Sequence, residues 1–449
     1  MAISLFNFLT QSLRESRFFG GDKPSLISEH SDHHGSQEDQ PKTDVSLWNQ
    51  EVGEMLLEIM TMAGYPSNSK LLHMEFFRES VAPLLGQHPR GGGPPTTWKS
   101  FMTDDHSPVE LSWCWSAKSE IPTARYSVEP IGKFAGLSSD PLNTAASIRL
   151  LGNTLPLSPE VDLYLHRHFQ QMFMSQNLPR SDTLEDGTLD VPQSQSFMAF
   201  DLLESTMVVK QYYLPTRRAL AEGISNAEII ARAIQRLPEP ANSLGASLDV
   251  IANFLQSFPV ESRPAVEIMA IDCLDPPQSR LKIYVRSRET TLQGVIEMLT
   301  LGGKTSISQE EEQSLRELWY LVFGLDATEH KDSDDLPDKD HRTAGLLYYY
   351  ELKMGVSAPK SKVYLPVRHY SQNDDQIARG LTTFLEKRGK RLMTGSYYDG
   401  VKRLCRHRDL GSGLGFHTYI TWASAKNNWN VTAYFNPEIN HACRSKSQD

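Results

Sequence analysis

The sequence predicts an α+β fold, built from short strands and helices that alternate along the chain. Two observations lead to this fold class. Six short segments show the two-residue alternation of a strand, and the stretches between them show the apolar spacing of helices. The triplet Lys-x-Tyr recurs in three of the strand-like segments, which indicates a degenerate internal repeat that mixes strands with helices.

Composition narrows the classes of function. The chain has 449 residues, of which 39% are hydrophobic, so it can bury a large core as one large domain or as two ordinary ones. The net charge of -10 and the pI near 5.8 argue against sequence-independent binding to nucleic acid, because such binding relies on summed positive charge. Any site for an anion is therefore local.

The cysteines indicate a reducing compartment. Cys114, Cys273, Cys405 and Cys443 lie far apart and without metal-ligand spacing. This spacing favours neither a disulfide framework nor a structural zinc site. A cytoplasmic location fits such a chain best.

The N-terminal part of the chain is predicted to lie outside the core. Residues 1–19 mix apolar and charged side chains without the long apolar run of a signal peptide or a membrane span, and they predict a short amphipathic helix of the mature chain. Residues 20–43 have few large apolar residues and cannot bury enough surface to offset the entropy of ordering. We expect residues 1–45 to form a flexible segment.

The predicted elements then follow in order. Residues 52–64 have apolar residues at helical spacing, and Gly64-Tyr65-Pro66 ends that helix. Residues 83–95 form a loop rich in glycine and proline. Strands are predicted at 109–115, 125–129, 208–214, 280–286, 362–367 and 430–435, and helical patterns lie between them at 219–237, 293–299 and 309–323.

The Lys-x-Tyr triplets carry the first chemical signal. They are Lys210 with Tyr212, Lys282 with Tyr284, and Lys362 with Tyr364, and the successive lysines lie 72 and 80 residues apart. Residues two apart project from the same face of a strand, so each triplet places an ammonium beside a phenol. Three such strands could direct three pairs inward.

Neighbouring arginines strengthen this signal. Together with Arg125 and Arg280, the three lysines would be too costly to bury without an anion, and a diphosphate is the obvious partner. The tyrosines could shelter an allyl cation from water, since aromatic faces attract cations. The simpler alternative places the lysines in water on outward faces, with the tyrosines packed beside them. Three copies with adjacent arginines favour the inward arrangement.

Glu110 has two interpretations. It lies in a strand with apolar and aromatic neighbours, where a carboxylate is either paired structurally or used as an acceptor and base. This stretch alone favours the structural ion pair.

Two other motifs match known sites only in part. Asp334, Asp335 and Asp338 fit the DDxxD pattern that chelates magnesium on a helix in isoprenyl diphosphate synthases and terpene cyclases, but Pro337 and polar flanks predict a solvated loop. The run Gly302-Gly-Lys-Thr305 lacks the earlier glycine of a phosphate-binding loop, because Met298 stands there.

Several longer stretches carry a family resemblance. The most specific are residues 98–113, 125–132, 140–143, 272–276 and 280–284, with Leu301-Gly-Gly beyond. From about residue 56 to 434, the chain resembles the fungal dimethylallyltryptophan synthase family of indole prenyltransferases, and within it the indole-diterpene branch.

The resemblance implies a particular version of the α+β fold. It implies a barrel of ten antiparallel strands surrounded by helices and built from repeated ββαα units, with the substrates in its lumen. This barrel would form one domain over residues 46–440, followed by a C-terminal tail at 441–449. The repeated Lys-x-Tyr strands fit such a closed architecture.

The resemblance also implies roles for single residues. Glu110 would accept a hydrogen bond from the indole N–H, which reverses the ion-pair interpretation. The diphosphate would be bound by Arg125, Lys210, Arg280, Lys282 and Lys362, the last at a position where some relatives have Gln. The allyl cation would be shielded by Tyr212, Tyr284, Tyr364, Tyr419 and Tyr434.

The expected reaction needs no cofactor. Dimethylallyl diphosphate would ionise in the basic pocket, a carbon of the aromatic acceptor would attack the allyl cation, and a base would remove a ring proton. Preorganised positive charge would replace magnesium, so no metal is expected.

The expected acceptor is a large neutral molecule. Tryptophan-using relatives have an arginine that clamps the substrate carboxylate thirteen residues before Arg280, where this chain has Glu267. Leu214 replaces a tyrosine near the amino acid, and Met102 completes the expected acceptor pocket. Free tryptophan is therefore disfavoured, an indole diterpene is favoured, and a phenolic polyketide such as a xanthone is the alternative.

Two other classes of protein stay open at this point. A magnesium-dependent isoprenyl diphosphate synthase or cyclase would use the Asp334 loop on an all-helical fold. A non-catalytic barrel could bind a hydrophobic anion without using Glu110. The expected partners are small molecules, with neither nucleic acid nor a membrane span, and the sequence leaves regiochemistry and oligomeric state open.

Overall fold

The computed structural model describes residues 42–91, 98–174, 191–238, 241–424 and 429–445. Within these residues, ten antiparallel strands form a closed barrel in which strands that follow one another in the chain are neighbours and β10 pairs with β1. The strands are Val109–Ser116 (β1), Thr123–Val128 (β2), Ser196–Leu202 (β3), Met207–Tyr213 (β4), Ala265–Asp272 (β5), Leu281–Ser287 (β6), Leu346–Leu352 (β7), Lys360–Leu365 (β8), His417–Ser424 (β9) and Trp429–Phe435 (β10).

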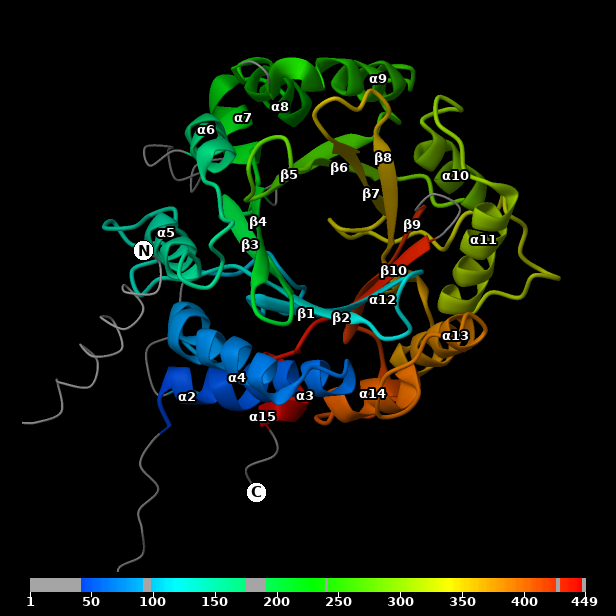
Figure 1. Ribbon diagram of the computed structural model, residues 1–449. Coiled ribbons are helices and arrows are strands. Elements are labelled where there is room, and N and C mark those ends of the chain that lie inside the picture. The colour runs from blue at the N-terminus through cyan, green and yellow to red at the C-terminus, as the bar shows by residue number, and fades with distance from the viewer. Residues whose placement is uncertain (1–41, 92–97, 175–190, 239–240, 425–428, 446–449) are drawn as a thin grey trace, which may run out of the picture. The chain divides into compact units, whose positions relative to one another are not determined.

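Helices form a ring around this barrel and follow one another around it in chain order (Figure 1). Short π-helical turns precede α3 and follow α4. The helices are Asp44–Trp48 (α2), Glu54–Met62 (α3), Ser67–Phe76 (α4), Thr144–Thr154 (α5), Tyr164–Phe173 (α6), Thr216–Glu222 (α7), Asn226–Gln235 (α8), Gly245–Gln256 (α9), Leu292–Thr300 (α10), Gln309–Phe323 (α11), Val367–Tyr370 (α12), Asp374–Glu386 (α13), Tyr397–Leu404 (α14) and Ala442–Ser445 (α15).

The expected ten-stranded barrel built from ββαα units is confirmed. Each strand pair from β1–β2 to β7–β8 is followed by two or more helices before the next pair begins. All six strand segments expected from alternation are strands, while β3, β5, β7 and β9 were not singled out by pattern. The single helical pattern at 219–237 is two helices, because Gly223 takes a left-handed conformation after α7 and Ser225 caps α8.

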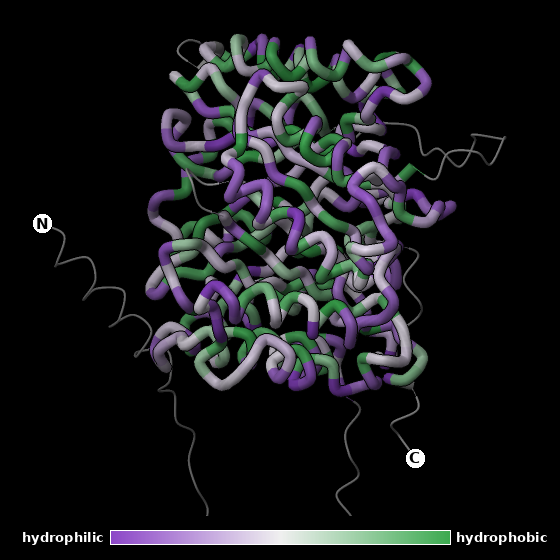
Figure 2. Tube along the Cα trace, turned by 90° about the vertical axis from the view of Figure 1, so that its right-hand side faces the viewer, coloured by the Kyte–Doolittle hydropathy of each residue, from purple (hydrophilic) through white to green (hydrophobic). Residues whose placement is uncertain are grey.

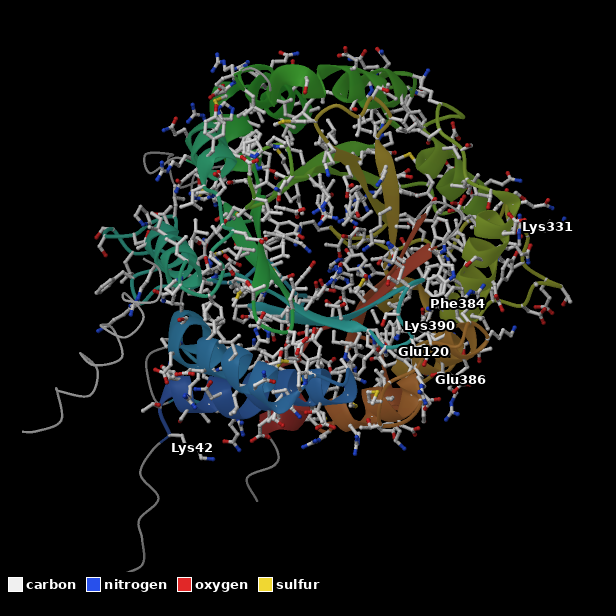
Figure 3. All side chains as sticks on the ribbon, in the orientation of Figure 1. Lys42, Glu120, Lys331, Phe384, Glu386 and Lys390 are labelled. Carbon is white, nitrogen blue, oxygen red and sulfur yellow. The ribbon has the colours of Figure 1, made fainter. Side chains whose placement is uncertain are left out.

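Side chains fill both the interior of the barrel and the layer between strands and helices (Figure 3). The outer layer is the main hydrophobic core, and it contains outward-facing aromatic residues such as Trp113 and Tyr350. Trp113 donates from its indole N–H to the Ile59 carbonyl at 3.1 Å, and Tyr350 donates to the Met298 carbonyl at 3.0 Å. These bonds fix α3 and α10 against the barrel.

Further contacts fasten the later helices. Lys390, labelled in Figure 3, follows α13 and donates to the carbonyls of Ala117 and Ser119 at 3.0 and 2.9 Å, in the turn between β1 and β2. Hydrophobic and hydrophilic residues are interspersed along the whole described trace (Figure 2). No helix among the described residues is long and apolar enough to cross a membrane.

The Asp-rich segment is a loop, as expected. Residues 334–338 are not helical, and the Asp335 carboxylate accepts hydrogen bonds from the N–H and hydroxyl of Thr290 at 3.0 and 2.7 Å. The barrel also excludes the all-helical magnesium-dependent synthase. Two other expectations, the amphipathic helix at 1–19 and most of the flexible segment at 1–45, lie outside the described residues; the described part of that segment includes the start of α2 at Asp44.

Candidate active site

The side chains of strand β6 alternate between the outer core and the lumen of the barrel. Its odd-numbered residues from 281 to 285 face the outer core, while Lys282, Tyr284 and Arg286 face the lumen, each about 7 Å from the next. One strand therefore carries an ammonium, a phenol and a guanidinium in sequence along the barrel. Strands β4 and β8 repeat the first two of these residue types, with Lys210 and Tyr212 and with Lys362 and Tyr364. We accordingly describe the lumen as a cation layer, a tyrosine layer and a charged rim.

The cation layer brings together the five basic residues expected to bind diphosphate. Lys210 forms an ion pair with Asp201 at 2.6 Å, and Arg125 contacts the same carboxylate at 3.2 Å. Lys282 and Arg280 both pair with Asp272, with the lysine contact at 2.8 Å. The pairing register places these residues on adjacent strands.

Asp201 and Asp272 were not expected from the sequence, where a diphosphate alone was expected to balance the positive charges of the buried lysines and arginines. Burial alone would raise the pKa of Asp201, but the positive charges of Arg125 and Lys210 outweigh this effect and lower the pKa to about 2. Lys282 and Arg280 likewise hold the pKa of Asp272 below its usual range against the effect of burial. The carboxylates thus stay charged and hold the basic side chains in place before any substrate binds.

Lys362 completes the cation layer without a carboxylate contact among the described ion pairs. Its ammonium donates to the Thr432 hydroxyl at 3.4 Å and lies over the rings of Tyr349 and Tyr364, at 5.9 and 5.1 Å from their centroids. Burial, together with the nearby positive charge of Arg125, lowers the pKa of Lys362 to about 7. Lys362 therefore lacks the counter-charge that Asp201 and Asp272 give the other basic residues, and a bound anion could supply it.

The tyrosine layer lies next to the cation layer. Tyr284 is at its centre, with ring centroids 6.0 Å from Tyr212, 5.6 Å from Tyr349 and 5.8 Å from Tyr364. Burial raises the pKa of these phenols, so they stay neutral. The rings of Tyr419 and Tyr434 extend the layer at 5.9 and 5.8 Å from Tyr364.

All five expected tyrosines therefore meet around one space, and Tyr349 joins them. The sequence analysis missed Tyr349, although it stands in the run Tyr348-Tyr349-Tyr350, where strand alternation directs the middle ring away from its neighbours. Phe197 adds a further ring, stacked on Tyr212 at 4.2 Å.

A cavity of about 260 Å³ opens beyond the tyrosine layer. Glu110 lies in its wall, and its carboxylate accepts a hydrogen bond from the Thr418 hydroxyl at 2.6 Å. Burial raises the pKa of Glu110 to about 7, and the Thr418 bond and the charge of Arg368 offset part of that rise. No ion pair to Glu110 occurs within the described part of the chain, which disfavours the structural ion-pair interpretation.

The three expected acceptor residues, Met102, Leu214 and Glu267, all line this cavity. Met102 lies in the loop before β1, which is anchored because the buried Glu129 carboxylate accepts bonds from Trp98 at 2.9 Å and Ser100 at 2.6 Å. Glu267 stands at a bulge in β5, where the pairing register shifts between residues 266 and 268. Such a bulge redirects a side chain, here into the cavity.

The charged rim was not foreseen from the sequence. It consists of Glu267, Arg286, Arg342 and Arg368, which line the end of the cavity. Arg286 donates to both carboxylate oxygens of Glu267, at 2.7 and 3.0 Å. The cavity therefore has cationic groups in Arg286, Arg342 and Arg368, although Glu267 stands where tryptophan-using relatives are expected to have an arginine.

Two side-chain groups within the described residues have metal-ligand spacing. Asp104, His341 and His369 form one, and Cys405, His407 and Glu438 the other. An arginine already contacts the carboxylate in each: Arg368 at 3.2 Å from Asp104, and Arg408 at 2.8 Å from Glu438. Neither group includes a residue of the cation layer.

A closed ββαα barrel whose lumen joins a basic cluster, a tyrosine layer and an acceptor cavity defines an aromatic prenyltransferase. The chain matches the model of the tryptophan dimethylallyltransferase family over residues 44–400, and it belongs to that family. It is therefore an enzyme, and a purely anion-binding barrel is not supported.

Two relatives illustrate the range of this family. The chain is 48% identical to 4-O-dimethylallyl-L-tyrosine synthase of Claviceps purpurea over 396 residues, which cover 88% of each chain. It is 32% identical to 7-dimethylallyltryptophan synthase of Aspergillus fumigatus, over 89% of this chain and 86% of the relative.

Solved structures share the fold. NotF prenyltransferase superposes with a TM-score of 0.75 at 23% identity, over 90% of this chain and 97% of that one. AnaPT from Neosartorya fischeri gives a TM-score of 0.72 at 23% identity, over 88% and 98% of the two chains.

Proposed function

We propose that this enzyme transfers the dimethylallyl group of dimethylallyl diphosphate to an aromatic amino acid, and that the favoured acceptor atom is the phenolic oxygen of L-tyrosine. The observation that carries the proposal is the position of Glu110, a carboxylate that shares one cavity with the tyrosine layer and the charged rim. The 48% identity to a relative named 4-O-dimethylallyl-L-tyrosine synthase supports the choice of acceptor.

The cation layer is suited to the leaving group. A diphosphate placed there would accept charge-assisted hydrogen bonds from Lys210, Lys282 and Lys362. As the bond between the allyl carbon and the diphosphate oxygen breaks, the electron pair stays with the diphosphate. Fixed positive charge stabilises the charge that develops there, since the site is buried and already organised by Asp201 and Asp272.

The tyrosine layer is suited to the allyl cation. Its rings are closely spaced and neutral, so they offer π-electron density without a nucleophile as strong as a phenolate. They also exclude water, which would otherwise trap the cation as an alcohol.

Glu110 is suited to activate the acceptor. In the proposed step, the phenolic oxygen of tyrosine attacks the allyl carbon and its proton passes to the Glu110 carboxylate. A pKa of about 7 makes this group an effective base near neutral pH. Because the new bond is C–O, no ring proton has to be removed.

The charged rim argues against the expected indole-diterpene acceptor. A large neutral terpenoid would shield the ion pairs of Glu267 with Arg286 and of Asp104 with Arg368 from water without supplying any charge of its own, which is costly. The same reasoning applies to the xanthone alternative. An amino acid carries both a carboxylate and an ammonium, so it matches a rim that holds both signs of charge.

L-Tryptophan is the second candidate. Glu110 could equally accept a hydrogen bond from an indole N–H, and a relative at 32% identity is named for tryptophan. Attack would then come from a ring carbon, and a base would have to remove the ring proton.

We also propose that no metal is required, because lysines and arginines in the cation layer supply the charge that magnesium would otherwise supply. Cytoplasmic location stays a prediction.

One assay tests the proposed function. Purified enzyme is incubated in EDTA with dimethylallyl diphosphate and, separately, L-tyrosine, L-tryptophan, an indole diterpene and a hydroxyxanthone, and products are identified by mass spectrometry and NMR. We expect one dimethylallyl group on the tyrosine oxygen. Preferred turnover of the terpenoid or the xanthone would contradict the acceptor, and activity that appears only after magnesium is added would contradict metal independence.

A further inference from the structure

We propose that Arg368 and Asp104 bind the zwitterionic head group of the amino-acid acceptor, with the guanidinium on its carboxylate and Asp104 on its ammonium. This inference rests on the proposed function and names the residues that would give it specificity for amino acids. It places the head-group site on α12 and on the loop before β1, away from Glu267 on β5.

Arg368 is held in place before any substrate arrives. It follows β8, the strand that carries Lys362 and Tyr364, and its side chain is 6% exposed. The guanidinium lies over the Tyr419 ring at 4.7 Å from the centroid, and it donates to the Tyr419 hydroxyl at 3.2 Å and to the Thr343 hydroxyl at 2.8 Å. A fixed, stacked guanidinium is well suited to bind a carboxylate.

Asp104 is held by its neighbours in the chain. The Asp105 carboxylate accepts bonds from Thr103 at 2.8 Å and from Asn436 at 3.0 Å, which fixes the loop on either side of Asp104. The Asp104 side chain itself is 40% exposed and touches Arg368 at 3.2 Å. Its carboxylate can therefore reach both the rim and a bound ligand.

The second ion pair of the charged rim, between Arg286 and Glu267, is less suited to open for a ligand. Arg286 donates to both oxygens of Glu267 and, at 2.9 Å, to the Thr343 carbonyl, so its donors are engaged within the protein. Opening that pair would leave a buried charge unpaired. The single contact between Arg368 and Asp104 can open at less cost, and a zwitterion that inserts there replaces one ion pair by two.

The two ends of the acceptor site are linked through β9. Thr418 bonds to Glu110, and its neighbour Tyr419 bonds to Arg368. Glu110 and Arg368 line the same cavity, and Asp104 contacts Arg368 at 3.2 Å. An acceptor with its phenol on Glu110 thus has its head group directed to Arg368.

Binding measurements with three ligands test this inference: L-tyrosine, tyramine, which lacks the carboxylate, and 3-(4-hydroxyphenyl)propanoate, which lacks the ammonium. Dissociation constants are measured by calorimetry for wild type, Arg368→Gln and Asp104→Asn. We expect Arg368→Gln to weaken L-tyrosine and the propanoate by roughly 50-fold or more and to leave tyramine unchanged. Asp104→Asn should weaken L-tyrosine and tyramine, and spare the propanoate.

Two comparisons separate this role from others. Arg368→Lys should retain part of the selectivity for ligands with a carboxylate. Arg379→Gln is the matched control, because Arg379 lies on α13 with a side chain that is 63% exposed, and it should keep the wild-type pattern. The inference is overturned if Arg368→Gln leaves L-tyrosine binding intact, weakens all three ligands equally, or has no more effect than Arg379→Gln. If wild type binds and prenylates none of the three ligands, the proposed function itself fails.

Discussion

Replacement of Glu110 by Gln is expected to lower kcat for the acceptor by about 10²- to 10⁴-fold, the usual contribution of a positioned general base. Glutamine keeps the shape of the side chain and can still accept a hydrogen bond from Thr418, so the fold and donor binding should persist. What it cannot do is take up the acceptor proton as the C–O bond forms.

The pH profile distinguishes a base from a residue that only shapes the cavity. Only the carboxylate form accepts the proton, so with a pKa of about 7 for Glu110 the wild-type kcat/KM for the acceptor should fall about tenfold per pH unit below that value. Thr418→Val removes a bond that lowers this pKa and should move the acid limb to higher pH. A Glu110→Gln enzyme with near wild-type kcat, or with the same acid limb, would show that Glu110 is not the base.

Replacement of Lys362 by Met is expected to stabilise the protein and to impair donor use. Lys362 is buried without a carboxylate contact in the described residues, so methionine relieves the cost of an ammonium in the lumen, about 1–4 kcal/mol. The same change removes one charge-assisted bond to the diphosphate, which should lower kcat/KM for dimethylallyl diphosphate by roughly 10- to 150-fold.

The stability gain has a defined pH dependence. The pKa of Lys362 is about 7 in the folded protein and 10.5 for an ordinary lysine, so the unfolded chain binds more protons between these values. The free energy of unfolding of the wild type therefore rises with pH across this window. The extra stability of Lys362→Met over the wild type is largest at or below about pH 7 and disappears toward pH 10.

Calorimetric unfolding at pH 7 and pH 9, together with donor kinetics, measures both effects. Lys360→Met is the matched control, because Lys360 is exposed on the same strand and should change neither quantity. If Lys362→Met is less stable than the wild type, the ammonium is not buried at a cost. If the variant uses dimethylallyl diphosphate normally, Lys362 does not bind the diphosphate.

Much of the fold, and the convergence of the expected basic residues and tyrosines in the lumen, could be predicted from the sequence for a physical reason. Strands such as β6 alternate a core-facing apolar residue with a lumen-facing polar one, and this pattern is visible in the letters. Strand β3 lacks it, because its lumen-facing side also carries apolar residues, Phe197 and Ala199. Its lumen-facing Asp201 thus went unnoticed, although it organises Arg125 and Lys210.

The acceptor end was harder to foresee, because its residues come from separate parts of the chain. Arg368 follows β8, Asp104 precedes β1, and Arg286 lies near the end of β6. Only closure of the barrel brings Arg368 and Arg286 to one cavity and Asp104 into contact with Arg368. The substitution at Glu267 was visible, but its bidentate partner Arg286 lies across a bulge that no local pattern predicts. The two anchors lost at Glu267 and Leu214 therefore do not by themselves decide the acceptor.

The most direct test is a crystal structure of the complex with L-tyrosine and an unreactive thiolo analogue of dimethylallyl diphosphate, grown without metal. We expect the diphosphate on Lys210, Lys282 and Lys362, the allyl group among the tyrosines, and the substrate phenol within hydrogen-bonding distance of Glu110. A diphosphate bound at the charged rim, or a phenol directed away from Glu110, would contradict the three-layer account of the lumen.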